Sequence, residues 1–309
     1  MDTINNIIEF IYFIDIYKHI YSSGQSSRFW LKNDPNGVVV ILGDYFKKKF
    51  KTNDPSIGQY FYHPCNIAQA AFGYYDNYVL TKKLEFKKLF LAQINWLEDN
   101  SKEYRNAYIY PFPYATKGFG TKPGWISGMY QGEILSCFVK AYVLTNDNKY
   151  LFLAKKVYNS YSLELGDEYG FKTEDKYGLW FEESMLIPAR HILNGFIFAV
   201  FGLYDYYRVS GRSDVKELFD RAINTIKKTL PEYDMGFWSY YDLQGTIASY
   251  SYHEDVHIPQ LRALHQITQE AIFKSYADKW EIYNNSWFCQ LRKKIYTLRY
   301  KMLKSGIRH

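Results

Sequence analysis

The chain of 309 residues is rich in apolar and aromatic side chains, which make up 47% and 20% of it and include 32 tyrosines. This composition excludes an intrinsically disordered protein and predicts one large or two ordinary folded domains. Three scattered cysteines exclude a disulfide framework, no segment approaches the roughly 20 apolar residues of a membrane span, and no pattern resembles a nucleic-acid-binding module. We therefore expect a soluble cytoplasmic protein without a metal or cofactor.

The first 60 residues, 1–60, are expected to form a helical or extended cap on the domain that follows. The apolar run from Ile7 to Ile14 is interrupted by Glu9 and followed by Asp15. It has no basic n-region and no small-residue cleavage site, so it does not resemble a signal peptide.

Residues 61–290 contain amphipathic helices that recur at a constant spacing. The first helix of each repeat is predicted to begin near Ala68, Gln131, Asn194 and His257, 63 residues after the one before. Each is followed by a short polar turn and a second helix with a charged outer face. Helical hairpins at one period predict an all-α dominated fold, an incomplete α/α toroid of about four hairpins.

Long segments rich in Gly, Pro and aromatic residues precede the inner helices. Segment 240–261 crowds tyrosines, histidines and carboxylates next to a predicted helix start, and 180–196 combines Trp, Phe and two glutamates with a helix start placed at Pro188. All such segments are expected to emerge at one end of the toroid and to contain short β-strands. Helix N-termini at that end favour an anionic ligand.

The last nineteen residues, 291–309, are predicted to form a basic amphipathic tail. They hold seven Lys and Arg side chains and no acid, so the rest of the chain is close to neutral. Leu291, Ile295, Leu298 and Met302 recur at helical spacing. One interpretation is a surface helix that packs this stripe on the body; the alternatives are contact with a polyanionic substrate or peripheral contact with an anionic membrane surface.

Several motifs in one order resemble the C-terminal domain of the D-glucuronyl C5-epimerases, enzymes that invert C5 of glucuronate within heparan-type polysaccharides. They are GWISGMYQGEILS, WFEES followed by LNGF, LPEYDMGFWSYYDL and SYHEDVHIPQL, within roughly Gly124–Tyr283. An upstream YHPCNIAQAAFGYY is also similar to the family. The resemblance implies an isomerase, a C5-epimerase acting on uronate residues of a polysaccharide such as heparan sulfate or heparosan, and a homodimer.

Position by position, the resemblance places the family's catalytic glutamate at Glu183 and two essential tyrosines at Tyr241 and Tyr252. Removal of the C5 hydrogen needs a base on one face of the ring and an acid on the other. We assign Glu183 and Tyr252 as that pair, with Tyr241 donating a hydrogen bond to the uronate. Two positions depart from the family: Ser184 stands in place of a catalytic tyrosine, and Gln244 in place of an arginine that faces the substrate carboxylate.

Arg190 is our candidate for the cation that Gln244 no longer supplies, placed in the first turn of an inner helix. An ion pair with Glu182 is the alternative role. Other predicted substrate-binding residues are Trp125, Gln131, Trp180, Ser184, Asn194, His253 and His257. For the tryptophans the alternative is a packed core, for Gln131 and Asn194 a helix cap, and for the two histidines a metal site.

Three other functions remain open from the sequence. A polysaccharide lyase removes the same C5 hydrogen and then expels the C4 substituent. An α/α-barrel glycoside hydrolase needs two carboxylates across the cleft, which Glu182 or Glu183 could supply with Asp242 or Glu254. A degenerate member of the family would bind the glycan without turning it over, in line with the changes at Ser184 and Gln244.

Overall fold

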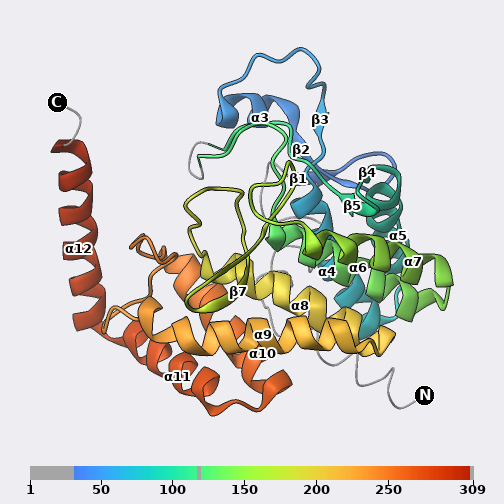
Figure 1. Ribbon diagram of the computed structural model, residues 1–309. Coiled ribbons are helices and arrows are strands. Elements are labelled where there is room, and N and C mark those ends of the chain that lie inside the picture. The colour runs from blue at the N-terminus through green and yellow to red at the C-terminus, as the bar shows by residue number, and fades with distance from the viewer. Residues whose placement is uncertain (1–30, 117–119, 307–309) are drawn as a thin grey trace.

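The computed structural model describes residues 31–116 and 120–306, and helical hairpins make up most of that range (Figure 1). Four hairpins occur in the described residues, each an inner helix followed by an outer one. They are α4 (Pro64–Thr81) with α5 (Leu84–Asp99), α6 (Gly128–Thr145) with α7 (Asn148–Tyr158), α8 (Leu193–Ser210) with α9 (Ser213–Thr229), and α10 (Ile258–Thr268) with α11 (Ala271–Asn285). The predicted incomplete α/α toroid is confirmed.

The inner helices α6 and α8 pack closely because glycines face each other across the contact. A Cβ on Gly132 would lie 2.5 Å from the Cα of Ala199, and one on Gly202 would lie 2.5 Å from the carbonyl oxygen of Gly132. Any side chain at either position would force the two helices apart. This contact sits in the core, where α6 buries an unbroken run of residues, 130–141.

Each hairpin turns at the same kind of residue. The inner helices end at Lys82, Asn146, Gly211 and Gln269, which all adopt the left-handed conformation with φ between 57° and 65°. Their backbone N–H groups donate to the carbonyl four residues back, which closes the helix with an αL cap. The outer helix then begins two residues later in each hairpin.

The long loops all emerge where the inner helices begin, the end that we call the mouth of the toroid. The N–H of Gly128, at the start of α6, donates to the carbonyl of Glu182 in the loop before α8, and the N–H of Leu193, at the start of α8, donates to the carbonyl of Tyr241 in the loop before α10. The predicted short strands are present as two antiparallel hairpins, β4 (Lys102–Tyr104) with β5 (Ala107–Ile109) and β6 (Lys172–Asp175) with β7 (Gly178–Phe181).

The described part of the predicted cap forms a small sheet with one helix. Strands β1 (Leu31–Asn33), β2 (Val39–Leu42) and β3 (Tyr60–Phe61) pair in that order, all antiparallel, and α3 (Gly43–Phe50) connects the last two. Phe46 of α3 is fully buried and stacks on Phe61. The first half of the predicted cap, residues 1–30, lies outside the described residues.

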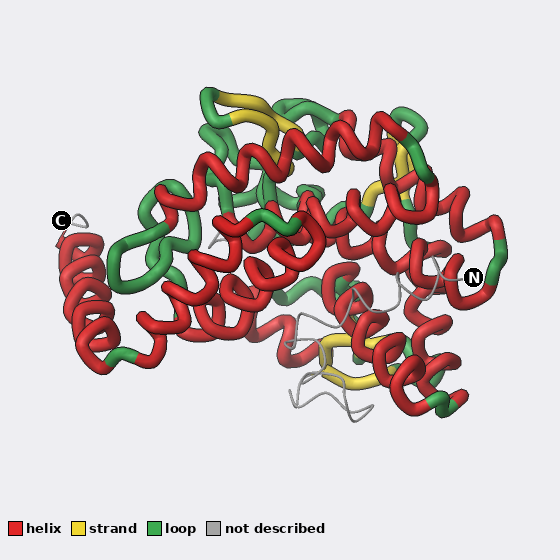
Figure 2. The backbone as a smooth tube through the Cα atoms, turned by 90° about the horizontal axis from the view of Figure 1, so that it is seen from below, coloured by secondary structure: helices red, strands yellow, loops and turns green. Residues whose placement is uncertain are grey.

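The predicted tail helix is present as α12 (Trp287–Gly306) and stands at one edge of the molecule beside a loop region (Figures 1 and 2). Its orientation differs from the packing that we expected. The stripe of Leu291, Ile295, Leu298 and Met302 is 44–63% exposed and is therefore not packed into the core of the body. Among the described residues no helix is both long and apolar enough to cross a membrane. Surface contact through residues 291–309 and the homodimer stay predictions.

Candidate active site

Two loops from different hairpins join at the mouth. Leu193 donates its backbone N–H to the carbonyl of Tyr241 (3.1 Å), and Leu243 donates to the carbonyl of Arg190 (3.2 Å). An antiparallel bridge between Ile192 and Asp242 lies between these bonds. The bridge brings the loop that carries Glu183 against the loop that carries Tyr241, although the two residues are 58 positions apart.

Glu183 lies at the centre of this junction and is only 4% exposed. Tyr241 donates its hydroxyl to Oε1 of Glu183 (3.2 Å), and the side-chain amide of Asn194 donates to Oε2 (3.4 Å). Gly195 on α8 makes room for the carboxyl group, since a Cβ there would lie 2.3 Å from Oε2. The loop and the first turn of α8 therefore form one fitted cradle for this carboxyl group.

Burial raises the pKa of Glu183 to about 8. The charges of Glu133 and Glu182 act in the same direction, whereas the Tyr241 hydrogen bond and the charge of Arg190 oppose it. The carboxyl group is therefore mostly protonated at neutral pH and ionises close to it. A group of this acidity can either give or take a proton under physiological conditions.

Tyr241 links Glu183 to Tyr252. Tyr241 is 8% exposed, and burial raises the pKa of its phenol well above the usual value, so it acts as a neutral donor. Its ring meets the ring of Tyr252 edge to face with centroids 4.9 Å apart. Tyr252 is 38% exposed and opens a π-helical turn, Tyr252–His257, that leads into α10. Such turns are frequent at functional sites. The three residues assigned from the resemblance therefore lie together.

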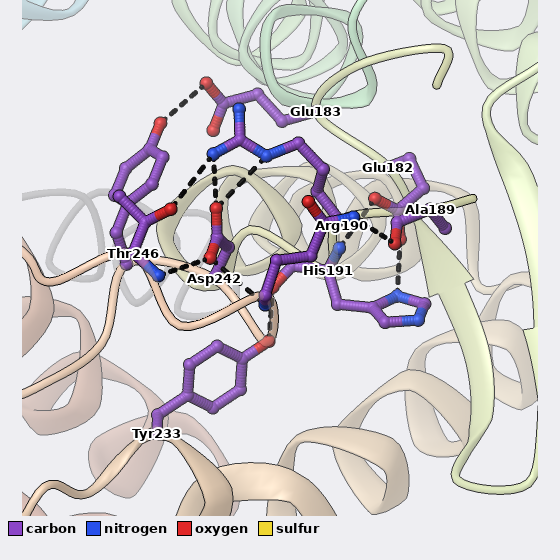
Figure 3. Close-up of polar contacts among 10 residues, drawn as sticks. Glu182, Glu183, Ala189, Arg190, His191, Tyr233, Asp242 and Thr246 are labelled. Carbon is purple, nitrogen blue, oxygen red and sulfur yellow. Dashed lines mark hydrogen bonds and ion pairs between the residues drawn. The ribbon is translucent and has the colours of Figure 1, made fainter. Parts of the chain in front are cut away.

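Arg190 is held by Asp242 and not by Glu182 (Figure 3). Its Nε and Nη2 both donate to Oδ2 of Asp242, which is fully buried and also accepts the N–H groups of Gln244 and Thr246 at Oδ1. The prediction that Arg190 lies in the first turn of a helix is wrong, because α8 begins only at Leu193. His191 adopts the left-handed conformation with φ 54°, and Ile192 is extended in the bridge to Asp242, so the helix begins only after them.

Glu182 is bound to His191 and takes no part in the Glu183 cluster. His191 Nδ1 lies 2.7 Å from Oε1 of Glu182, and the N–H of His191 donates to Oε2 (3.0 Å). The Trp180 ring is fully buried, stacks on His191 at 4.1 Å and donates its indole N–H to Asp175 (2.8 Å). Trp180 is thus a packing residue in this structure and not a platform for a sugar.

His253 and His257 are enclosed by protein, contrary to the substrate contact that we expected. Both are fully buried, and the hydroxyl of Ser239 lies 2.8 and 3.1 Å from their Nδ1 atoms. His253 is also stacked on Trp238, with ring centroids 3.9 Å apart. Burial lowers the pKa of His253 to about 4 and of His257 to about 3, so both are neutral. Within the described ranges no group of three or more His, Cys, Asp or Glu is placed to hold a metal ion.

The remaining candidates divide between the cluster and its surroundings. Asn194 contacts Glu183 directly, and the fully buried Ser184 places its hydroxyl without a hydrogen-bond partner among the described residues. Gln131 is fully buried and donates to Tyr108 O and Ser160 Oγ, so its role is internal. Trp125 is 8% exposed and donates to the Tyr114 carbonyl. Gln244 is exposed and reaches the Ala189 carbonyl (3.3 Å).

The sequence analysis missed two polar residues of the inner helices. Glu133 on α6 is 2% exposed, accepts a hydrogen bond from Gln69 on α4 (3.2 Å) and raises the pKa of Glu183 through its charge. Gln260 on α10 is fully buried and donates to the carbonyl of Asn194 (3.0 Å). Glu133 could have been found from the sequence, because it is a carboxylate inside the apolar run QGEILSCFVKAYVL and charged residues are rarely buried without a partner or a function.

Solved structures of carbohydrate-active enzymes share the fold. An inactive variant of an α-1,6-mannanase from Salegentibacter sp. HEL1_6, solved with α-1,6-mannotriose, is 15% identical and superposes with a TM-score of 0.53 over 91% of this chain and 69% of that one. Cellobiose 2-epimerase from Bacillus thermoamylovorans B4167 is 12% identical, with a TM-score of 0.51 over 77% of this chain and 66% of that one. Likeness at this level of identity shows the α/α toroid alone.

Sequence relatives are more specific. D-glucuronyl C5-epimerase of Caenorhabditis elegans is 28% identical over 223 residues, 65% of this chain and 36% of that protein. An uncharacterized protein of Methanocaldococcus jannaschii is 31% identical over 180 residues, 56% of each chain. The chain thus spans only about a third to a half of these relatives. The family model for the D-glucuronyl C5-epimerase C-terminus matches residues 100–282, which include Glu183, Tyr241 and Tyr252, and the chain therefore belongs to that family.

Proposed function

We propose that the protein is a C5-epimerase that inverts uronate residues within a polysaccharide. The observation that carries this proposal is the cluster of Glu183, Tyr241 and Tyr252 at the mouth, in a chain of this family. An isomerase of this kind needs proton donors and acceptors and no change of oxidation state. The three side chains offer two phenols and a carboxyl group with a pKa of about 8.

The proposed reaction begins with loss of the hydrogen at C5, which is acidified by the neighbouring carboxylate. One residue of the pair Glu183 and Tyr252 takes this proton, and the other gives a proton to the opposite face. Return from the same face would only restore the starting sugar. A carboxyl group that titrates near pH 8 is close to the optimum for either role. In this scheme the neutral Tyr241 turns its single hydroxyl hydrogen from Glu183 to the enediolate that forms between the two steps.

The substrate carboxylate needs a positive charge, and we propose Arg190 for it. Asp242 fixes the guanidinium beside Glu183, as Figure 3 shows, and the side chain keeps 12% of its surface exposed. The charge of Arg190 already lowers the pKa of Glu183, which places the two groups in electrostatic contact. An arginine held in this way would be a prepared partner for a uronate.

The contacts of two other carboxylates, Glu182 and Asp242, argue against a glycoside hydrolase that would pair either of them with Glu183. Hydrolysis with retention or inversion uses a pair of carboxyl groups, both free to act on the glycosidic bond. Glu182 is bound twice by His191, and Asp242 is bound by Arg190 and two backbone N–H groups. Neither can pair with Glu183 without giving up these contacts.

Exchange at C5 in deuterated water tests the proposal. The protein is incubated with a glucuronate-containing polysaccharide, and the product is examined by NMR and by chain length. Deuterium at C5, inverted configuration and intact chains are expected. A new unsaturated uronate would indicate a lyase, and new reducing ends without unsaturation a hydrolase. Binding without any exchange would indicate a glycan-binding protein and would fit the loss of the family tyrosine at Ser184.

A further inference from the structure

A pocket of about 420 Å³ lies between α12 and the loop that carries Tyr241. Its walls include the rings of Trp238 and Tyr250 from the loop, and Gln290, Lys293, Lys294 and Thr297 from the helix. The volume falls in the range of small-molecule sites, roughly 300 to 1,000 Å³. Trp238 belongs to the same small hydrophobic cluster as Tyr241, so the pocket shares packing residues with the proposed catalytic cluster.

The helix is tied to that loop by specific contacts. Cys289 and Tyr296 pack on a small hydrophobic cluster, separate from the main core, that includes Phe237, Trp238 and Tyr241. The guanidinium of Arg292 lies over the Phe237 ring at 4.4 Å. The wall that α12 contributes is therefore fixed to the same cluster that holds a residue of the active site.

The pocket combines flat apolar faces with positive charge. The ammonium of Lys293 lies 4.0 Å from the centre of the Trp238 ring and 5.4 Å from that of Tyr250. Trp238 is fully buried and stacks on His253, so it forms the floor of the pocket, whereas the ring of Tyr250 is 48% exposed. Lys294 adds a second ammonium, no acid occurs in residues 287–309, and the nearby carboxylate of Glu254 is hydrogen-bonded to Tyr250. The exposed ring of Tyr250 can accept the apolar face of a sugar ring, while ammonium groups select a carboxylate.

We propose that this pocket is a second subsite, which binds a uronate residue of the polysaccharide other than the one that reacts. The inference rests on the proposed function for the identity of the polysaccharide, and goes beyond it by naming where a second residue of the polysaccharide binds. The helix side of the pocket, on α12, lies after residue 282 and so outside the family match. Leu298, which belongs to the exposed apolar stripe of α12, also lines the pocket and adds an apolar contact to it.

The test compares two neutralising substitutions that remove the same charge from α12. Lys293→Gln removes an ammonium inside the pocket, and Arg299→Gln removes an exposed guanidinium that does not line it. Binding of a glucuronate-containing octasaccharide and of a disaccharide is measured by calorimetry at low salt, with a neutral octasaccharide as reference. Lys293→Gln should weaken octasaccharide binding about tenfold and leave the disaccharide unchanged, whereas Arg299→Gln should change neither by more than about twofold.

Tyr250→Ala provides a second, independent variant and should also weaken the octasaccharide selectively. Thermal unfolding checks that each variant is folded. Equal effects of Lys293→Gln and Arg299→Gln would overturn the subsite. The subsite would also be overturned if Lys293→Gln weakened binding to anionic phospholipid vesicles and left binding to the oligosaccharide unchanged. The proposed function is judged apart, by C5 exchange of the wild-type protein. If the wild-type protein exchanges C5 and Lys293→Gln does not selectively weaken octasaccharide binding, only the subsite is disproved. If Lys293→Gln has that selective effect but the wild-type protein does not exchange C5, the subsite stands and the epimerase activity is disproved.

Discussion

The inner helices bury an ionisable group at each end, and the two ends differ in their access to solvent. At the mouth, Glu183 is 4% exposed but connects through Tyr241 to the 38% exposed Tyr252. In the second half of α6, the side chain of Lys140 is 1% exposed and lies 3.8 Å from Asp205 of α8 and 5.0 Å from the centre of the Phe72 ring. Burial shifts both pKa values toward the neutral form, raising that of Glu183 and lowering that of Lys140.

A buried ionisable group with a shifted pKa is thus not sufficient evidence of a catalytic site in this fold. Lys140 is surrounded by helices, so its charge serves the contact among α4, α6 and α8. Glu183 is held by a loop against another loop, and the path through Tyr241 leads outward. We therefore propose that the helical end serves stability and that the loop end serves the chemistry.

The largest effect is expected from the proposed proton-transfer pair at the mouth. Glu183→Gln and Tyr252→Phe each keep the shape of the side chain and remove only the ionisable function. Inversion at C5 should fall by about 10² to 10⁴-fold in either variant, because each loses one of two proton-transfer groups. NMR of the product in deuterated water measures inversion and exchange separately.

If both variants invert C5 at the wild-type rate, Glu183 and Tyr252 do not carry out the proton transfers. Tyr240→Phe is the matched control, since this neighbouring phenol is partly buried against the main hydrophobic core and lies outside the Glu183 contacts. Its exchange rate should match that of the wild-type protein.

At the helical end, Lys140→Met should lower stability and spare chemistry. The substitution leaves Asp205 without its buried partner, and breaking such a pair costs about 3 kcal/mol in the free energy of unfolding. Urea unfolding measures this loss, and C5 exchange well below the unfolding transition should be unchanged. The double variant Lys140→Met with Asp205→Leu should recover much of the stability. A Lys140→Met protein of normal stability and lost exchange would reverse the assignment of the two ends.

Arg190→Gln tests whether the mouth carries the cation for the substrate. Loss of a charge-assisted contact should weaken binding of a uronate oligosaccharide about tenfold and leave a neutral analogue unchanged. Because Asp242 would then lose its partner, Arg190→Gln is combined with Asp242→Asn to limit the cost of a buried unpaired charge. Equal weakening for the charged and neutral ligands would point to a loop that has lost its shape.

The sequence predicted what depends on local pattern. The inner helices were found because apolar runs at a fixed period specify helical hairpins, and the site cluster was found through motifs that the family shares. The partners of Arg190 and His253 were not predicted. They are Asp242 and Ser239, 52 and 14 residues away in the sequence, and these contacts depend on how the loops pack against each other. The exposed stripe of α12 was also missed, since an amphipathic pattern does not say which face meets the body.

The smallest expected effect is a shift of acidity at the mouth. Glu183 holds a proton in the folded protein up to about pH 8, whereas in the unfolded chain it loses that proton near its usual 4.5. The free energy of unfolding contributed by this group therefore falls as pH rises from about 4.5 to 8, and Glu183→Gln should flatten that part of the stability profile. If Glu183 is the base, C5 exchange rises through about pH 8; if it is the acid, exchange falls there.

Glu133→Gln sharpens this reading, because the charge of Glu133 raises the pKa of Glu183. Removing that charge should move the inflection of the exchange profile to lower pH while the maximal rate stays within a few-fold of wild type. Glu281→Gln removes an equal charge from the exposed surface of α11 and should leave the inflection in place. An inflection that moves in neither variant would mean that the titrating group is not Glu183. A loss of the maximal rate in Glu133→Gln would instead give Glu133 a direct part in the chemistry, as a second carboxyl group beside Glu183.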